Sequence, residues 1–153
     1  MAYTRKEYVH GAPGPKITIF EMGYPKEEYD REVILQASEA GSLSDRSLEA
    51  LRVHVNRALS EKLSKYHYKI KLYPHSIVRG KKWLAFAGAD RISSGMRKAF
   101  GKPSGRAVKV RRNQTIAVVR VDKSDVNYVR GILESVVPKL ATTCRIEIRE
   151  ILN

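Results

Sequence analysis

Apolar and polar residues alternate in several short segments of the chain, as they do in strands that bury one face. These segments predict strands over residues 16–22, 32–38, 66–73, 77–79, 106–111, 115–121 and 144–151. Because Pro74 ends the strand before it, the segment 77–79 is expected to be a short edge strand. The strands 106–111 and 115–121 are expected to form a hairpin through residues 112–114.

Two other segments repeat apolar residues every three or four positions, which is typical of amphipathic helices. The first helix is predicted to begin after Ser44, a residue type that caps helices. Its apolar stripe is Leu48, Leu51, Val55, Leu59 and Leu63. The second is predicted to begin at Ser124 and to end at Pro138, which cannot continue a helix. The cations beside the first stripe are Arg46, Arg52, Arg57, Lys62 and Lys65.

The order of these elements predicts an α+β fold, with two main helices packed against a mixed or antiparallel sheet. We expect residues 1–153 to form a single domain, because no repeat or linker divides them. Residues 1–15 are expected to be an irregular arm, since prolines and glycines interrupt any periodic pattern there. Residues 88–105 are expected to form a long basic loop that carries four glycines.

Positive charge is concentrated in one part of the chain. The 153 residues carry a formal net charge of +13, and such an excess normally implies a polyanionic partner, with nucleic acid ahead of an anionic membrane surface. The segment from residue 79 to 112 holds one acid, Asp90, and therefore carries +10, which leaves +3 for the rest. Its cations are Arg79, Lys81, Lys82, Arg91, Arg97, Lys98, Lys102, Arg106, Lys109, Arg111 and Arg112. Clustered cations of this kind indicate phosphate binding.

The loop 88–105 and the arm add aromatic side chains to this charge. Phe100 and Met96 either stack against bases or fold back onto the core, and exposed aromatics among cations favour RNA over duplex DNA grooves. In the arm, Tyr3, Arg5 and Lys6 suit a segment that lies on RNA, although a flexible solvated tail fits them equally well. The cations beside the first helix stripe form either a solvated face or a second RNA-facing surface. The glycines do not make a nucleotide-triphosphate loop, because a proline follows the Gly-Lys pair.

Other classes of site are excluded by composition. The chain has one cysteine, Cys144, and four scattered histidines, so neither an internal disulfide nor a metal site is expected. No apolar run is long enough to cross a bilayer, and the first residues do not resemble a secretory leader. We therefore expect an intracellular, cytoplasmic protein that works without a membrane, a metal or a cofactor.

Several motifs resemble one protein family. They read AGADR at residues 87–91, GMR at 95–97 and FGKP at 100–103, followed by Gly105. Further similarity lies in YTRKEY at 3–8, PKI at 15–17, LEA at 48–50 and YPH at 73–75. These motifs resemble the archaeal and eukaryotic L-ten-e ribosomal proteins, the large-subunit counterparts of the bacterial L-sixteen proteins.

The resemblance implies an α+β fold sometimes called a hammerhead, and a structural role in the large ribosomal subunit. It implies binding to ribosomal RNA near the aminoacyl-tRNA site, with the basic loop directed toward the peptidyl transferase centre. Arg91, Arg97, Lys98 and Lys102 would then contact ribosomal RNA or the transfer RNA, with Tyr3, Arg5, Lys6 and His75 on the RNA-facing side. Neighbouring ribosomal proteins are further expected partners, and the free protein is expected to be a monomer.

One departure from the family is visible at the beginning of the chain. Family members usually carry an additional short basic stretch before the YTRKEY segment, whereas this chain begins at Met1-Ala2-Tyr3. Either the chain is a truncated form, or its lineage does without that RNA contact.

Two other functions are alternatives to a structural role. An RNA-processing or RNA-modifying enzyme would use His75, with Asp90 or His67 completing an acid–base pair. No nucleophile–base motif or cofactor fingerprint accompanies these residues, so the sequence predicts no catalytic residue. A free-standing nucleic-acid-binding protein is the other alternative, although no helix-turn-helix pattern is present.

Overall fold

A computed structural model describes residues 2–80, 96–97 and 99–151 of the chain, which form nine strands, two α-helices and three short 3-10 helices. Five strands form one sheet in the order β2 (Glu21–Gly23), β5 (His67–Ile70), β8 (Thr115–Val121), β3 (Arg31–Ala37) and β9 (Cys144–Glu150). The helices α1 (Asp45–Lys62) and α2 (Val126–Val136) pack against this sheet and against each other. We call the five-stranded sheet with its two helices the body.

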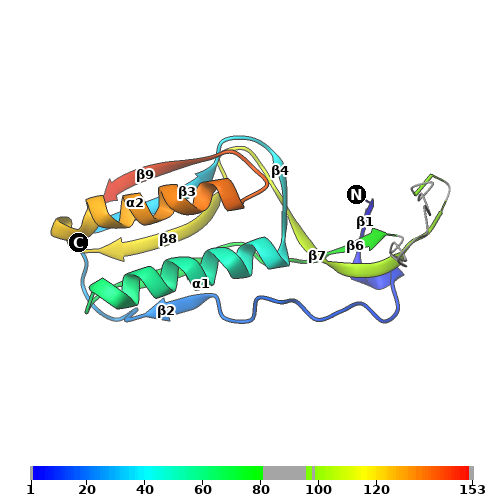
Figure 1. Ribbon diagram of the computed structural model, residues 1–153, viewed down its shortest axis with the longest axis horizontal. Helices are drawn as coiled ribbons and strands as arrows, with labels where there is room; N and C mark the ends of the chain where they lie inside the picture. The colour runs from blue at the N-terminus through cyan, green and yellow to red at the C-terminus, as the bar shows by residue number, and fades with distance from the viewer. Residues whose placement is uncertain (1, 81–95, 98, 152–153) are drawn as a thin grey trace, which may run out of the picture.

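The remaining four strands form a second, smaller sheet. Their order is β1 (Ala2–Thr4), β6 (Ser76–Gly80), β7 (Lys102–Val110) and β4 (Gly41–Ser44). The 3-10 helices are η1 (Lys6–Tyr8), η2 (Lys123–Asp125) and η3 (Val137–Lys139). The molecule is elongated, and β7 runs from the body toward the end where β1 and β6 lie (Figure 1). All strand pairs that the structure describes are antiparallel, so the α+β prediction is confirmed, with two sheets in place of one.

The predicted helix stripe forms the centre of the core. Leu48, Leu51, Val55 and Leu59 are all fully buried, and they pack with β3 and β8 residues in one apolar cluster. Leu63 follows the last turn of α1 and is partly buried against the same cluster. The Ser44 side chain accepts a hydrogen bond from the Ser47 N–H at 3.1 Å, which satisfies one of the free donors of the first turn.

The strand predicted over residues 16–22 is wrong over most of its length, because only β2 overlaps it. Residues 16–20 run outside any strand between the arm and β2. Ile17 is fully buried, whereas Ile19, two positions further on, is half exposed, so burial in this segment does not follow the alternation. The Lys16 N–H donates to Asp45 Oδ2 at 3.2 Å, and the Phe20 carbonyl accepts from the Ile70 N–H at 2.8 Å.

The predicted hairpin of residues 106–121 is also wrong, because β7 and β8 belong to different sheets. The turn between them binds the end of β3. The Asn113 N–H donates to the Ala37 carbonyl at 2.8 Å, and the Ala37 N–H donates to the Gln114 carbonyl at 3.0 Å. Asn113 adopts a left-handed conformation with φ of 63°, which asparagine tolerates better than most residues. The turn therefore passes the chain from one sheet to the other.

The pairing of β1 with β6 corrects two predictions, that of an irregular arm and that of an edge strand over residues 77–79. The arm was expected to be irregular, but it begins with β1, which pairs with β6 from Ala2–Arg79 to Thr4–Ile77. As a consequence β6 lies between β1 and β7 and is not an edge strand. A strand of three residues is too short to produce a recognisable alternation, so the sequence pattern missed it.

The end of the predicted basic loop belongs to a strand. Residues 102–105 form the first part of β7 and pair with β6, with a register shift between Val78 and Arg79. Pro103 is tolerated there because β4 pairs with β7 only from Ala107 onward, so the other side of Pro103 needs no ladder donor. The rest of the predicted loop up to residue 95, together with Lys98, lies outside the described residues.

Candidate nucleic-acid interface

The arm and the four-stranded sheet together line an open hollow of about 240 Å³. Its lining residues come from the end of β1, from the beginning of β6 and from β7, and they are Tyr3, Thr4, Arg5, His75, Ser76 and Lys109. We call this cavity, together with the six residues that line it, the hollow. They offer hydroxyl groups, a guanidinium, an ammonium and an imidazole, and none of them is a carboxylate. Such a set of donors fits phosphate oxygens.

His75 is oriented within the hollow by the backbone carbonyl of Tyr73. Its Nδ1 atom lies 3.1 Å from the Tyr73 carbonyl, which can only accept, so Nδ1 carries the proton. The side chain is exposed, and Nε2 remains available to a ligand. On the other side of the hollow, Lys109 Nζ lies 5.9 Å from the centroid of the Tyr3 ring, a cation–π distance.

The structure brings only part of the predicted site together. Four predicted residues meet in the hollow: Tyr3, Arg5, His75 and Lys109. Lys6 follows in η1, and Arg97 and Lys102 are exposed near the far end of β6 and β7. The exposed cations Arg5, Lys6, Arg97, Lys102 and Lys109 are named the sheet cations below. Lys81, Lys82, Arg91 and Lys98 lie outside the described residues.

Two predicted cations lie elsewhere. Arg111 and Arg112 are exposed in the turn that follows β7, on the side of the body. β7 has nine residues, so this turn is about 30 Å from the strand's beginning at ~3.3 Å per residue. These two arginines therefore do not belong to the same patch as Lys102.

Two further predicted cations have structural partners. Arg106 is half-buried and donates from Nε to the Pro13 carbonyl at 2.7 Å, which holds the arm against the sheet. The Arg79 guanidinium lies over the Phe100 ring, with 3.9 Å between Cζ and the ring centroid. Both side chains are thus at least partly occupied in holding local structure.

Ion pairs divide the molecule into two parts. Those described by the structure all join residues of the body or of loops beside it, such as Arg57 with Glu61 at 2.8 Å and Arg120 with Glu32 at 3.1 Å. None of the sheet cations forms an ion pair with another described residue. In the described parts of the arm and the four-stranded sheet, Glu7 is the one acid. The sheet cations therefore have no ionic partner among the residues that the structure describes.

The cations of α1, and Lys65 just after it, differ from the sheet cations because most of them have partners within the body. Arg52 pairs with Glu49 at 2.6 Å, and Lys65 pairs with Glu27 at 3.6 Å. Lys62 lies 4.2 Å from the centroid of the Tyr128 ring. Most of the cations beside the helix stripe are thus partnered within the body, and the interpretation as a solvated face is favoured over a second RNA-facing surface.

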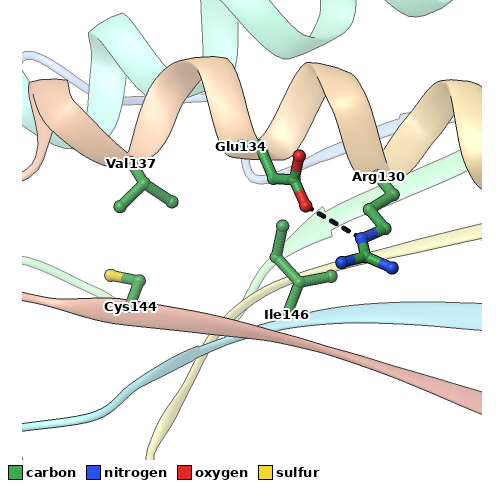
Figure 2. Close-up of a pocket in the computed structure, with 5 residues that line it drawn as sticks. All are labelled: Arg130, Glu134, Val137, Cys144 and Ile146. Atoms are coloured by element: carbon green, nitrogen blue, oxygen red, sulfur yellow. Dashed lines mark hydrogen bonds and ion pairs between the residues drawn. The ribbon is translucent and has the colours of Figure 1, made fainter.

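A second hollow, of about 280 Å³, lies between α2 and β9. Figure 2 shows Arg130 and Glu134 on one wall, where they pair at 2.8 Å, and the apolar side chains Val137 and Ile146 beside Cys144. Its two charges neutralise each other, so it offers no free cation to a polyanion. Burial raises the pKa of the Cys144 thiol, which therefore stays protonated and unreactive at neutral pH.

The acid–base pair that an enzyme would need is not assembled among the described residues. His67 belongs to β5 in the body, where its Nε2 atom lies 2.8 Å from Glu21 Oε1. Its side chain is buried, and its ring stacks with Tyr29 at a centroid distance of 6.5 Å. His75 belongs to the other sheet, and Asp90 lies outside the described residues.

The described part of the chain also bears on metal sites and membrane spans. There, no group of three or more histidine, cysteine or acidic side chains is arranged to hold a metal ion. Neither described α-helix combines the length and the apolar character that crossing a bilayer requires.

Sequence patterns missed two members of the hollow, Thr4 and Ser76. Both hydroxyls reach the hollow because β1 pairs with β6, a contact between residues more than seventy positions apart. Thr4 does lie inside the YTRKEY motif and Ser76 directly follows the YPH motif. The sequence could have indicated Thr4 and Ser76 only through their proximity to these motifs. No local sequence pattern shows that the two motifs lie side by side in the fold.

Comparison with known proteins shows similarity along nearly the whole chain. A model of the family described as ribosomal protein L16p/L10e matches residues 1–147. A protein of Hyperthermus butylicus named large ribosomal subunit protein uL16 is 43% identical over 148 residues, which cover 95% of this chain and 82% of that protein. Proteins with the same name from Picrophilus torridus and Staphylothermus marinus are each 44% identical, over 95% and 94% of this chain and 84% of theirs.

Proposed function

This chain belongs to the ribosomal protein L16p/L10e family, and from that premise we propose that it is a single-domain structural constituent of the large ribosomal subunit. In this role it binds large-subunit ribosomal RNA with the hollow and the sheet cations. Its relatives are named as ribosomal proteins and not as enzymes, which agrees with the prediction of no catalytic activity.

The observation that carries this proposal is the separation of charge. Acids and bases neutralise each other across the body, whereas the described cations of the four-stranded sheet have no ionic partner among described residues. A folded protein gains nothing from keeping like charges unpaired on one sheet, because they repel each other. Phosphate groups of RNA remove that repulsion and release counterions, which supplies affinity.

The hollow adds geometry to this charge. Arg5 provides a planar guanidinium, Lys109 a compact ammonium, and Thr4 and Ser76 hydroxyl groups, all of which can donate to phosphate oxygens. A single phosphate group has the oxygens to accept from several of these donors at once. The hollow is therefore suited to fix the register of the protein on the RNA backbone, as phosphate contacts do in general.

The basic loop extends the proposal toward the functional centre of the ribosome. Following the family resemblance, the loop points toward the peptidyl transferase centre and lies near the aminoacyl-tRNA site. Arg91, Arg97, Lys98 and Lys102 then contact ribosomal RNA or the transfer RNA. Arg97 and Lys102 are exposed at the described ends of this segment, which supports such contacts.

The salt dependence of RNA binding tests the proposal. One variant replaces four sheet cations with alanine: Arg5, Arg97, Lys102 and Lys109. The matched control replaces four exposed cations of the body that take part in ion pairs: Arg57, Lys69, Arg130 and Arg149. Both variants lose the same formal charge.

The affinity for a large-subunit ribosomal RNA fragment is measured at several salt concentrations. For the sheet variant, the slope of log affinity against log salt should flatten by about 0.7–0.9 for each phosphate group that is no longer bound, so by up to about 3 units in total. The body variant should retain the slope of the wild type. Equal slopes in all three proteins would refute the assigned surface, and no binding by the wild type would refute the function.

A further inference from the structure

Phe100 is the most exposed of the large apolar side chains that the structure describes. The residue is 67% exposed, and it lies between β7 and a turn in which the Ala99 N–H donates to the Met96 carbonyl at 3.1 Å. A single exposed ring is not by itself unusual. What distinguishes Phe100 is the group that covers one of its faces.

The covered face of Phe100 lies against Arg79 at the end of β6. The guanidinium carbon is 3.9 Å from the ring centroid, which is a close cation–π contact. Arg79 Nε is buried and has no hydrogen-bond partner among the described residues, so the contact that the structure describes for this guanidinium is its packing on the ring. With one face held in this way, the exposure of the ring comes from its opposite face and edges.

The backbone beside the ring is fixed by close packing. Gly101 is buried, and a Cβ atom there would lie 2.8 Å from Met96 Sδ and 2.9 Å from the Gly80 nitrogen. The methionine can move, but the backbone nitrogen of β6 cannot move without disturbing the pairing with β7. The residue that follows Phe100 therefore packs closely against β6.

We propose that Phe100 is a stacking platform for an unpaired RNA base, with the layers in the order Arg79, Phe100 and nucleobase. This inference rests on the proposed function and assigns one contact within it. Aromatic rings bind unpaired bases of any sequence because every base has a π-face. A paired base in an A-form helix cannot reach such a ring, so the partner is a base in a loop, a bulge or a single strand.

Charge around the ring favours a nucleobase over an apolar protein segment. The exposed cations Arg97 and Lys102 flank Phe100 in sequence and have no ion pair with a described residue. A base carries its own phosphates to these cations, whereas a segment of apolar side chains would leave them without a partner. The site thus combines a π-face with phosphate contacts, as single-strand binding surfaces do.

Binding to two probes separates stacking from phosphate contact. The probes are a twelve-nucleotide oligoadenylate and an abasic oligomer with the same number of phosphates. The variant is Phe100→Leu, which keeps an apolar side chain without a π-face. Its matched control is Tyr24→Leu, because Tyr24 is also exposed, at 54%, but lies beside β2 in the body.

We expect Phe100→Leu to weaken binding of oligoadenylate by roughly 5- to 100-fold and to leave binding of the abasic oligomer unchanged. Tyr24→Leu should change neither affinity. If Phe100→Leu binds oligoadenylate as the wild type does, or loses both probes equally, the stacking site is refuted. If the wild type still binds the abasic oligomer in that case, the proposed phosphate-binding surface stands. If the wild type binds neither probe, both proposals are refuted.

A spectroscopic variant gives a second readout. In the double variant Trp83→Phe and Phe100→Trp, the new indole is the one tryptophan of the chain. Its fluorescence should be quenched by oligoadenylate and not by the abasic oligomer, because stacking on a base quenches the indole. Equal responses to the two probes would contradict stacking at this position.

Discussion

Glu21 shows how charges are satisfied within the body. Its carboxylate accepts from His67 Nε2 at 2.8 Å and from Lys69 Nζ at 3.3 Å, all on the outer side of β2 and β5. The hydrogen bond from His67 and then that from Lys69 hold the pKa of the Glu21 carboxyl below its ordinary value of 4.5. A carboxylate with a lowered pKa stabilises the fold while it is charged.

The variant Glu21→Gln tests this contribution through its pH dependence. Because the folded pKa lies below the unfolded one, the stabilisation is fully present above about pH 4.5 and is lost as the pH falls through the folded pKa. The melting temperature of the wild type should therefore exceed that of Glu21→Gln near neutral pH. The difference should shrink when thermal unfolding is measured at decreasing pH below about 4.5.

Glu39→Gln serves as the control, since Glu39 is exposed and forms no ion pair with a described residue. A difference between wild type and Glu21→Gln that stays constant from neutral pH down to pH 3 would contradict the assigned hydrogen bonds.

Among the elements, α1 couples the two sheets. Ser44 is the last residue of β4 and also the N-cap of α1, so one residue ends a strand of the smaller sheet and begins a helix of the body. Next to it, Asp45 is buried and accepts from the Lys16 and Arg46 N–H groups at 3.2 and 2.9 Å. This junction fixes the direction in which the helix leaves the sheet.

Replacing Ser44 with alanine removes the side-chain acceptor of the Ser47 N–H while keeping a residue that β4 tolerates. The free energy of unfolding should fall by about 1 kcal/mol, as measured by urea denaturation. Ser60→Ala, near the other end of the same helix and exposed, should change it by less than about 0.5 kcal/mol. Equal effects of the two substitutions would show that the cap does not stabilise the helix.

Local pattern predicted both helices, because their apolar spacing and caps depend on residues within a few positions of one another. It also predicted β3, β8 and β9 to within about one residue of their ends. Local pattern failed where the structure depends on which strands pair with each other. The alternation in residues 16–22 did not show that most of the segment lacks a neighbouring strand, and residues 112–114 did not show that Ala37 of another strand anchors their turn.

The candidate nucleic-acid interface, like the fold, could be predicted from the sequence only in part. Composition indicated the cations of the hollow and the sheet, and the resemblance indicated His75 and the arm. The meeting of Tyr3 and Lys109 depends on a three-residue strand that joins distant parts of the chain, and sequence pattern carries no sign of it. The separation of Arg111 and Arg112 from Lys102 follows from the length of β7, which a count of charges does not contain.

At the scale of the whole molecule, the two sheets have different electrostatic roles. The formal charge of +13 is a property of the chain, but the described ion pairs all lie in or beside the body. The body is thus an internally neutralised scaffold, and the four-stranded sheet with its arm carries unneutralised cations at one part of an elongated molecule (Figure 1). Such a shape lets a folded body present charge at a distance from its own core.

The central claim is that the four-stranded sheet attaches this protein to the large ribosomal subunit. Co-sedimentation with large subunits depleted of the protein, at moderate and at high salt, tests it most directly. The wild type and the variant lacking Arg57, Lys69, Arg130 and Arg149 should both sediment with the subunit at moderate salt.

The variant lacking the sheet cations Arg5, Arg97, Lys102 and Lys109 should remain in the supernatant at a salt concentration at which the other two proteins still bind. Co-sedimentation of this variant to the same extent as the wild type, or equal loss of both variants, would contradict the claim.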